Sequence, residues 1–130
     1  MPSVRAMAHR ILIADRNEEF RRSLATILHE AGYSVAETAT GTQALAQVKS
    51  CDLLITELAT PDMDGLQVLT AIRRTDPDLP IIATLGTFSG RLLRSASIFR
   101  VPTLEKPFKQ AVLMKTVESA LSKKAWPAGL

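Results

Sequence analysis

Short apolar runs alternate with helical patterns along the chain, and this alternation constrains the fold more than any other feature of the sequence. The runs are predicted as strands at residues 10–15, 33–36, 51–57, 79–85 and 101–104. Short continuous apolar runs are typical of parallel strands that are covered on both faces. Strands that alternate with helices over short connections predict an α/β fold with a parallel sheet between helices.

The predicted helices carry their own start and stop signals. Asn17 is a candidate cap for the first helix, and Gly32 is expected to end it. Thr40 and Gly41 open a second helix, residues 63–65 open a third, and the few apolar positions of residues 87–99 predict a short fourth. Helical spacing predicts the inward-facing residues, which are Phe20, Leu24, Ile27, Leu28 and Ala31, then Ala44, Leu45 and Val48, then Leu66, Leu69 and Ile72, and in the last helix Val112, Leu113, Val117, Ala120 and Leu121.

Composition indicates one ordinary globular domain, predicted over residues 9–124 between a loose leader at 1–8 and a tail at 125–130. The net charge is only +3, and pairs such as Arg21–Arg22 and Arg73–Arg74 are scattered. We therefore expect these cations to lie on solvated helix faces and no nucleic-acid partner. The single cysteine, Cys51, rules out an intramolecular disulfide and fits a reducing cytoplasm, and no apolar run has the length of a membrane span.

Three segments, in order and at their spacing, identify a family. They are Ile-Leu-Ile-Ala-Asp at 11–15, Pro-Asp-Met-Asp-Gly-Leu at 61–66 and Leu-Glu-Lys-Pro-Phe at 104–108. With them, residues 9–122 resemble the receiver domain of bacterial response regulators in two-component signalling. The resemblance implies a CheY-like, flavodoxin-like fold, a three-layer α/β/α sandwich around a five-stranded parallel sheet of order 2-1-3-4-5. It also implies a cytoplasmic signalling module rather than an enzyme.

The resemblance further implies a site at the carboxyl ends of the strands, where the family gathers acids around Mg²⁺ and a phosphoacceptor aspartate. Asp15 matches the first acid, but Arg16 stands where the second is expected. Glu57 stands at the phosphoacceptor position, and the family's lysine is retained as Lys106. We expect the Lys106–Pro107 bond to be cis, as in the family.

The positions that report phosphorylation are also changed. The hydroxyl position falls on Leu85, and the aromatic position falls on Thr103. A one-residue shift of register would bring Thr84 or Thr87 to the hydroxyl position instead. Because side chains alternate along a strand, such a shift needs structural support.

The charges around this site balance without a metal. Asp15 and Glu57 face Arg16 and Lys106, so two negative groups meet two positive ones. Opposite charges near 4 Å attract by about 4 kcal/mol at a surface-like dielectric, before the desolvation that offsets much of that attraction. We therefore expect no metal ligands and lost or weak Mg²⁺ binding. Any ligands that remain would be Asp15, Glu57 and the carbonyl of Ala59.

Glu57 has two interpretations, which the sequence leaves open. Its side chain is longer than that of aspartate by one C–C bond, about 1.5 Å. It could therefore reach toward Lys106 and imitate a phosphorylated state. Alternatively, any polar residue was tolerated there after metal binding was lost. The missing hydroxyl at Leu85 weakens the first interpretation.

These changes predict a degenerate receiver that acts through protein–protein contacts without phosphorylation. The expected partner is a sensor histidine kinase or a downstream signalling protein. A homodimer through the fourth helix, fifth strand and last helix is a further candidate, with Arg91, Arg94, Lys115 and Glu118 on that surface, and Arg21 and Arg22 mark an alternative one. The competing hypothesis is a competent phosphoacceptor in a phosphorelay. A flavin or nucleotide carrier is disfavoured, because residues 15–19 are acidic and lack the glycines of a phosphate cradle.

Overall fold

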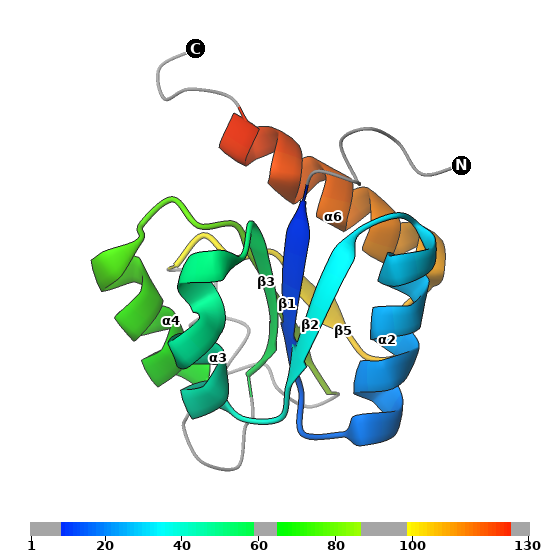
Figure 1. Cartoon of the computed structure of the whole chain (residues 1–130), viewed down its shortest axis with the longest axis horizontal. Helices are drawn as coiled ribbons and strands as arrows, with labels where there is room; N and C mark the ends of the chain where they lie inside the picture. The colour runs from blue at the N-terminus through cyan, green and yellow to red at the C-terminus, as the bar shows by residue number, and fades with distance from the viewer. Residues whose placement is uncertain (1–8, 59–64, 87–98, 126–130) are drawn as a thin grey trace.

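A five-stranded parallel sheet forms the centre of the molecule in the computed structural model, which describes residues 9–58, 65–86 and 99–125 (Figure 1). The strand order is β2-β1-β3-β4-β5, and every neighbouring pair is parallel. This confirms the predicted fold class and the order 2-1-3-4-5. The strands are β1 (Arg10–Ala14), β2 (Ser34–Thr38), β3 (Leu53–Glu57), β4 (Ile81–Leu85) and β5 (Thr103–Glu105).

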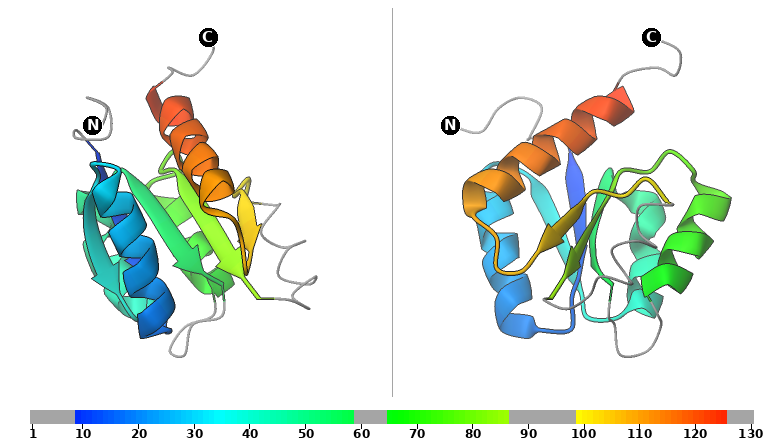
Figure 2. Two further views of the ribbon diagram at one scale, coloured as in Figure 1. Left: turned by 90° about the vertical axis from the view of Figure 1, so that its right-hand side faces the viewer. Right: turned by 180° about the vertical axis from the view of Figure 1, so that it is seen from behind.

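Helices cover both faces of the sheet, which gives three layers (Figures 1 and 2). One face carries α2 (Glu18–Glu30) and α6 (Gln110–Ala125), and the other carries α3 (Gly41–Gln47) and α4 (Gly65–Thr75). A 3₁₀ turn, η1 (Val48–Ser50), follows α3 and was not predicted. The helix predicted over 87–99 lies outside the described residues, apart from Phe99.

Alternation of side chains along the central strands builds one core on each face. In β1, Ile11 and Ile13 pack with the residues of α2 and α6, whereas Leu12 and Ala14 pack with those of α3 and α4. Every residue of β3 and β4 is buried. Burial on both faces is the reason these strands read as continuous apolar runs. It also holds their carboxyl ends, where the candidate site lies, on a tightly packed frame.

The predicted helix signals act as expected in α2 and α3. The Asn17 side chain accepts a hydrogen bond from the Phe20 N–H at 2.9 Å, and the Thr40 hydroxyl accepts one from the Gln43 N–H at 3.2 Å. Gly32 follows α2 with a φ of 103°, in the left-handed region that favours glycine. Within the described residues, no helix has both the length and the apolar character needed to cross a membrane.

Several predicted boundaries were too early. Cys51, Leu79 and Val101 are buried but precede the first residues of β3, β4 and β5. Burial of a side chain does not require a ladder hydrogen bond, so an apolar run extends beyond the strand that it marks. Strand β2, predicted at 33–36, instead runs from Ser34 to Thr38.

The inward orientation predicted for Val112 was wrong, since this side chain is 46% exposed. Leu113, Val117 and Leu121, which are four residues apart, form the buried row of α6. Residues spaced by four lie on one face of a helix, and Val112 is turned about 100° away from that row.

Candidate functional site

The candidate site lies where the carboxyl ends of the strands meet, at the lower edge of the sheet in Figure 1. Asp15 and Arg16 directly follow β1, Glu57 is the last residue of β3, and Lys106 directly follows β5. Strands β1, β3, β4 and β5 are paired in parallel, so these ends lie side by side. The structure therefore brings together four side chains that the sequence singled out.

Lys106 binds Asp15. The Lys106 Nζ lies 2.8 Å from the Asp15 Oδ2, and only 2% of the Asp15 side chain is exposed. The other oxygen, Asp15 Oδ1, accepts a hydrogen bond from the Asn17 N–H at 2.8 Å. Both oxygens of this carboxylate are therefore bound by the protein's own donors. The Lys106 peptide bond to Pro107 is cis, as predicted.

Arg16 binds Glu57 through both its main chain and its side chain. The Arg16 N–H donates to Glu57 Oε2 at 3.1 Å, and Arg16 Nε lies 3.3 Å from Glu57 Oε1. The guanidinium side chain is 60% exposed, whereas 9% of the Glu57 side chain is exposed. Glu57 is thus directed toward the arginine that stands at the position of the family's second acid.

The surroundings of Glu57 shift its pKa. Burial raises the pKa of Glu57 above its ordinary value, and the hydrogen-bonded Asp15 carboxyl and its charge raise it further. The Arg16 N–H and the positive charge of Lys106 act in the opposite direction. The net shift is upward, because the loss of hydration and the Asp15 carboxyl together outweigh the Arg16 N–H and the Lys106 charge.

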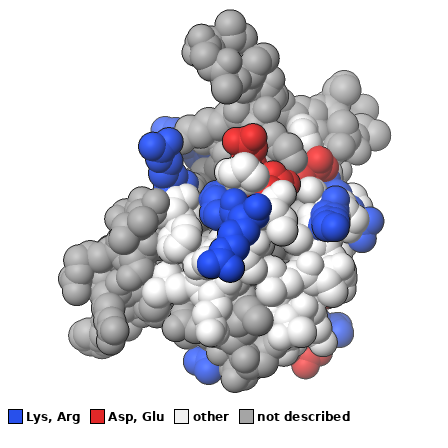
Figure 3. Space-filling model, turned by 90° about the vertical axis from the view of Figure 1, so that its left-hand side faces the viewer, with Lys and Arg blue, Asp and Glu red and all other residues white. Residues whose placement is uncertain are grey.

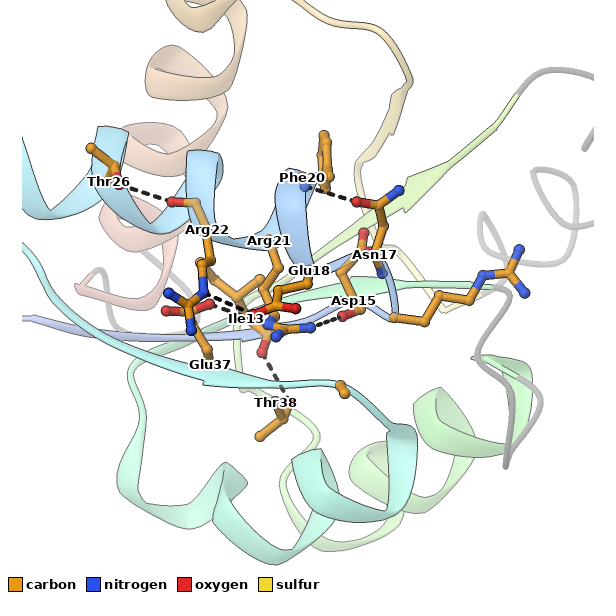
Figure 4. A network of polar contacts seen from close by, with 12 residues as sticks. Ile13, Asp15, Asn17, Glu18, Phe20, Arg21, Arg22, Thr26, Glu37 and Thr38 are labelled. Atoms are coloured by element: carbon orange, nitrogen blue, oxygen red, sulfur yellow. Dashed lines mark hydrogen bonds and ion pairs between the residues drawn. The ribbon is translucent and has the colours of Figure 1, made fainter.

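Arg21 supports the site and was misassigned from the sequence. Its Nη1 donates to the Asp15 carbonyl oxygen at 2.8 Å, and its Nε donates to Glu37 Oε1 at 3.1 Å (Figure 4). Its side chain is only 14% exposed, compared with 70% for Arg22. Arg21 therefore joins the start of α2 to β1 and β2 and is not a solvated cation. Its acceptors lie 6 and 16 residues away in the chain, so no local pattern identified it.

Arg73 was also expected on a solvated face and is half-buried instead. Its Nη1 donates to the Leu79 carbonyl at 2.8 Å, and its Nε donates to the Phe99 carbonyl at 3.4 Å. Burial lowers the pKa of Arg73. On the face formed by α3 and α4, Lys and Arg side chains stand in separate groups among uncharged atoms, with acidic groups beside them (Figure 3). The absence of a nucleic-acid partner stays a prediction.

The positions expected to report phosphorylation are placed only in part. Leu85 is buried at the end of β4, and Thr103 is partly buried at the start of β5. Thr84 pairs directly with Glu57 in the sheet register, so the two side chains share a face without any shift of register. Whether Thr84 takes the hydroxyl role stays a prediction. Thr87 and Ala59 lie outside the described residues.

The donor set present does not fit a divalent cation. Mg²⁺ requires a near-octahedral set of oxygen ligands at about 2.0–2.1 Å. In the part of the chain that the structure describes, no group of three or more His, Cys, Asp or Glu residues could hold a metal. Three of the four oxygens of Asp15 and Glu57 accept hydrogen bonds from the protein's own donors, and the fourth, Glu57 Oε1, forms an ion pair with Arg16 Nε. A metal would have to displace these donors next to a fixed guanidinium charge.

Known proteins resemble this chain over most of its length. The family model described as response regulator receiver domain matches residues 11–118. The response regulator receiver protein CpdR of Brucella abortus (strain 2308) is 31% identical over 115 residues, which cover 86% of this chain and 96% of that protein. Sensor kinase CckA of the same organism is 29% identical over 121 residues, which cover 87% of this chain but only 12% of the kinase.

A solved structure shares the fold. The response regulator receiver domain protein (CheY-like) from Methanospirillum hungatei JF-1 superposes with a TM-score of 0.84. The match covers 90% of this chain and 96% of that protein, at 24% sequence identity. At this identity the similarity concerns the fold alone, which is the five-stranded sheet with its two helical layers.

Proposed function

The chain belongs to the response regulator receiver domain family, and we propose that it is an atypical receiver, a signalling module rather than an enzyme, that acts through protein–protein contacts without being phosphorylated. The observation that carries this proposal is the contact between Arg16 and Glu57. Arg16 stands where the family has an acid and binds both oxygens of the residue at the acceptor position.

The charges of the site support this proposal. Phosphoryl transfer to a carboxylate requires an accessible oxygen and a cation that neutralises the incoming phosphoryl group. Here the oxygens of Glu57 are bound by Arg16, and those of Asp15 are bound by Lys106 and Asn17. Arg16 and Lys106 thus neutralise the two carboxylates that would otherwise be available to a metal ion.

The arrangement also bears on the two interpretations of Glu57. A mimic of the phosphorylated state requires the Glu57 carboxylate to engage Lys106. Instead, the Lys106 ion pair is made with Asp15, and Glu57 is paired with Arg16. These contacts favour the second interpretation, in which a polar residue was tolerated at position 57 after metal binding was lost.

The class of partner is inferred from the family and not from the geometry of the site. Receiver domains act with sensor kinases and other signalling proteins, and the similarity to CpdR and to part of CckA is consistent with such a role. We infer that a protein of this class binds the chain. A homodimer through the predicted fourth helix, β5 and α6 is a second arrangement, and size-exclusion chromatography with light scattering would detect it. Arg91 and Arg94 of that surface lie outside the described residues.

Incubation with acetyl phosphate and Mg²⁺, followed by intact mass measurement, tests the proposal. We expect no gain in mass for the natural chain. The doubly reverted variant Arg16→Asp/Glu57→Asp is the positive control, because it returns an acid to the second position and an aspartate to the acceptor position. A Mg²⁺-dependent gain of one phosphate on Glu57 or Asp15 of the natural chain would overturn the proposal and establish the phosphoacceptor alternative.

A further inference from the structure

The Phe20 ring covers the ammonium group of Lys106. The Lys106 Nζ lies 4.1 Å from the centre of the ring, and its Asp15 partner lies 2.8 Å away. The ring of Phe108 meets Phe20 edge to face, with centroids 5.8 Å apart and an interplanar angle of 88°. Lys106 is thus held between a carboxylate and an aromatic face, and Phe20 touches the segment that leads into α6.

We propose that Phe20 is a positioning residue that fixes Lys106 on Asp15 and connects the candidate site to the segment 106–109 before α6. The inference rests on the proposed function in one respect, since it treats Lys106 as held by the protein and not free to bind a phosphoryl group. The helical spacing of the sequence predicts for Phe20 only a place on the inner face of the first helix.

The contacts of Phe20 belong to a ring of interactions that begins and ends at Asp15. Asp15 Oδ1 accepts from the Asn17 N–H at 2.8 Å, and Asn17 Oδ1 accepts from the Phe20 N–H at 2.9 Å. The Phe20 ring then contacts Lys106, which returns to Asp15 Oδ2. The capping interaction that starts α2 therefore also places the ring. One carboxylate orients both the main chain before Phe20 and the ammonium group above its ring.

The position of Lys106 makes this contact effective. Its main-chain N–H donates to the Leu85 carbonyl at 2.8 Å, so the backbone is attached to β4 and only the side chain can be redirected. That side chain is 23% exposed. Cation–π contacts strengthen as the cation loses water, and a partly desolvated ammonium benefits more than one at an open surface.

The second contact of the ring leads out of the site. Phe108 packs against Phe20 and against the core shared by α2 and α6. A change in the position of Lys106 is therefore transmitted through Phe20 to Phe108 and the start of α6. This route does not use Leu85 or Thr103, the two positions at which the chain lacks the side chains that report phosphorylation in the family.

Replacement of Phe20 by leucine tests the inference, with Phe20→Tyr as the variant that keeps the ring. Phe99→Leu is the matched control, because it removes a ring that packs on the opposite core. Reductive methylation followed by peptide mass mapping gives the rate at Lys106 relative to that at Lys49, an exposed lysine of η1. We expect Phe20→Leu to raise this ratio about fivefold, which corresponds to about 1 kcal/mol, and the other two variants to leave it unchanged. Hydrogen exchange of residues 106–113 should also accelerate in Phe20→Leu alone.

An unchanged ratio in a folded Phe20→Leu variant would overturn the inference, and so would an equal increase in Phe99→Leu. If Phe20→Leu does not fold, proton NMR of the natural chain decides the question. The Cε protons of Lys106 should resonate upfield of those of Lys49 because of the ring current, and coincident shifts would refute the contact. Phosphorylation of the natural chain would overturn the proposed function while leaving these ratios and shifts as expected, so the two failures are distinguishable.

Discussion

Replacement of Lys106 by methionine should destabilise the protein far more than replacement of Arg16 by methionine. Methionine keeps an unbranched apolar stem and removes the ammonium group. The Asp15 side chain, 2% exposed, would then lose its cation and keep only the Asn17 N–H. Loss of one partner of a buried pair costs about 3–5 kcal/mol, and the partial exposure of Lys106 places this variant near the lower end, at about 3 kcal/mol.

The Arg16 pair provides the contrast. Its guanidinium side chain is 60% exposed, and exposed pairs contribute at most about 1 kcal/mol. Glu57 would also keep its hydrogen bond from the main-chain N–H at position 16, which the substitution leaves in place. We therefore expect Arg16→Met to cost less than about 1 kcal/mol. The ordering of the two costs follows from burial, because each pair joins one cation to one carboxylate and the Lys106–Asp15 pair is the less exposed.

Urea unfolding followed by circular dichroism measures both costs, and equal m-values would show that the same surface is exposed. A domain of this size has a stability of about 5–15 kcal/mol, so both variants should remain folded. Adding Asp15→Asn to Lys106→Met should recover about 2 kcal/mol, since it removes the uncompensated buried charge. A cost for Lys106→Met no larger than that of Arg16→Met, or no recovery on adding Asp15→Asn, would refute the reasoning.

Three further predictions concern the same site. Because the pKa of Glu57 is raised, the native state binds a proton more tightly than the unfolded state, so stability falls as pH rises from the ordinary glutamate value through the raised one. Glu57→Gln should remove this part of the slope in a pH series of urea titrations, and an unchanged slope would contradict the assignment. Arg16→Asp/Glu57→Asp should show heats of Mg²⁺ binding by calorimetry that the natural chain lacks. If the double variant shows no heat of binding, residues other than these two also prevent Mg²⁺ from binding. Asn17→Ala should cost about 1 kcal/mol through loss of the cap, whereas Asn17→Asp should cost little, as judged by urea unfolding; equal costs would show that the side-chain acceptor is not what stabilises α2.

The sequence by itself was sufficient for the layers of the fold and the location of the site. Buried parallel strands can be recognised as continuous apolar runs, and amphipathic helices by apolar residues three or four positions apart. Both patterns repeat over neighbouring residues. The resemblance to receiver domains then placed Asp15, Glu57 and Lys106 at the carboxyl edge of the sheet, where the structure has them. The caps at Asn17 and Thr40 depend on atoms three residues apart and were likewise predictable.

Only the tertiary structure decided which cation binds which acid. Arg16 and Glu57 are 41 residues apart, and Asp15 and Lys106 are 91 residues apart, so their pairing depends on how the strands are ordered and how far each side chain reaches. The same reason explains why Arg21 and Arg73, which bind distant carbonyl groups, read as surface cations. Phe20 looked like one more core residue, because a ring that also covers an ammonium group has the same helical spacing as one that only fills space. Local periodicity records the face on which a residue lies, whereas long-range packing determines what it touches there.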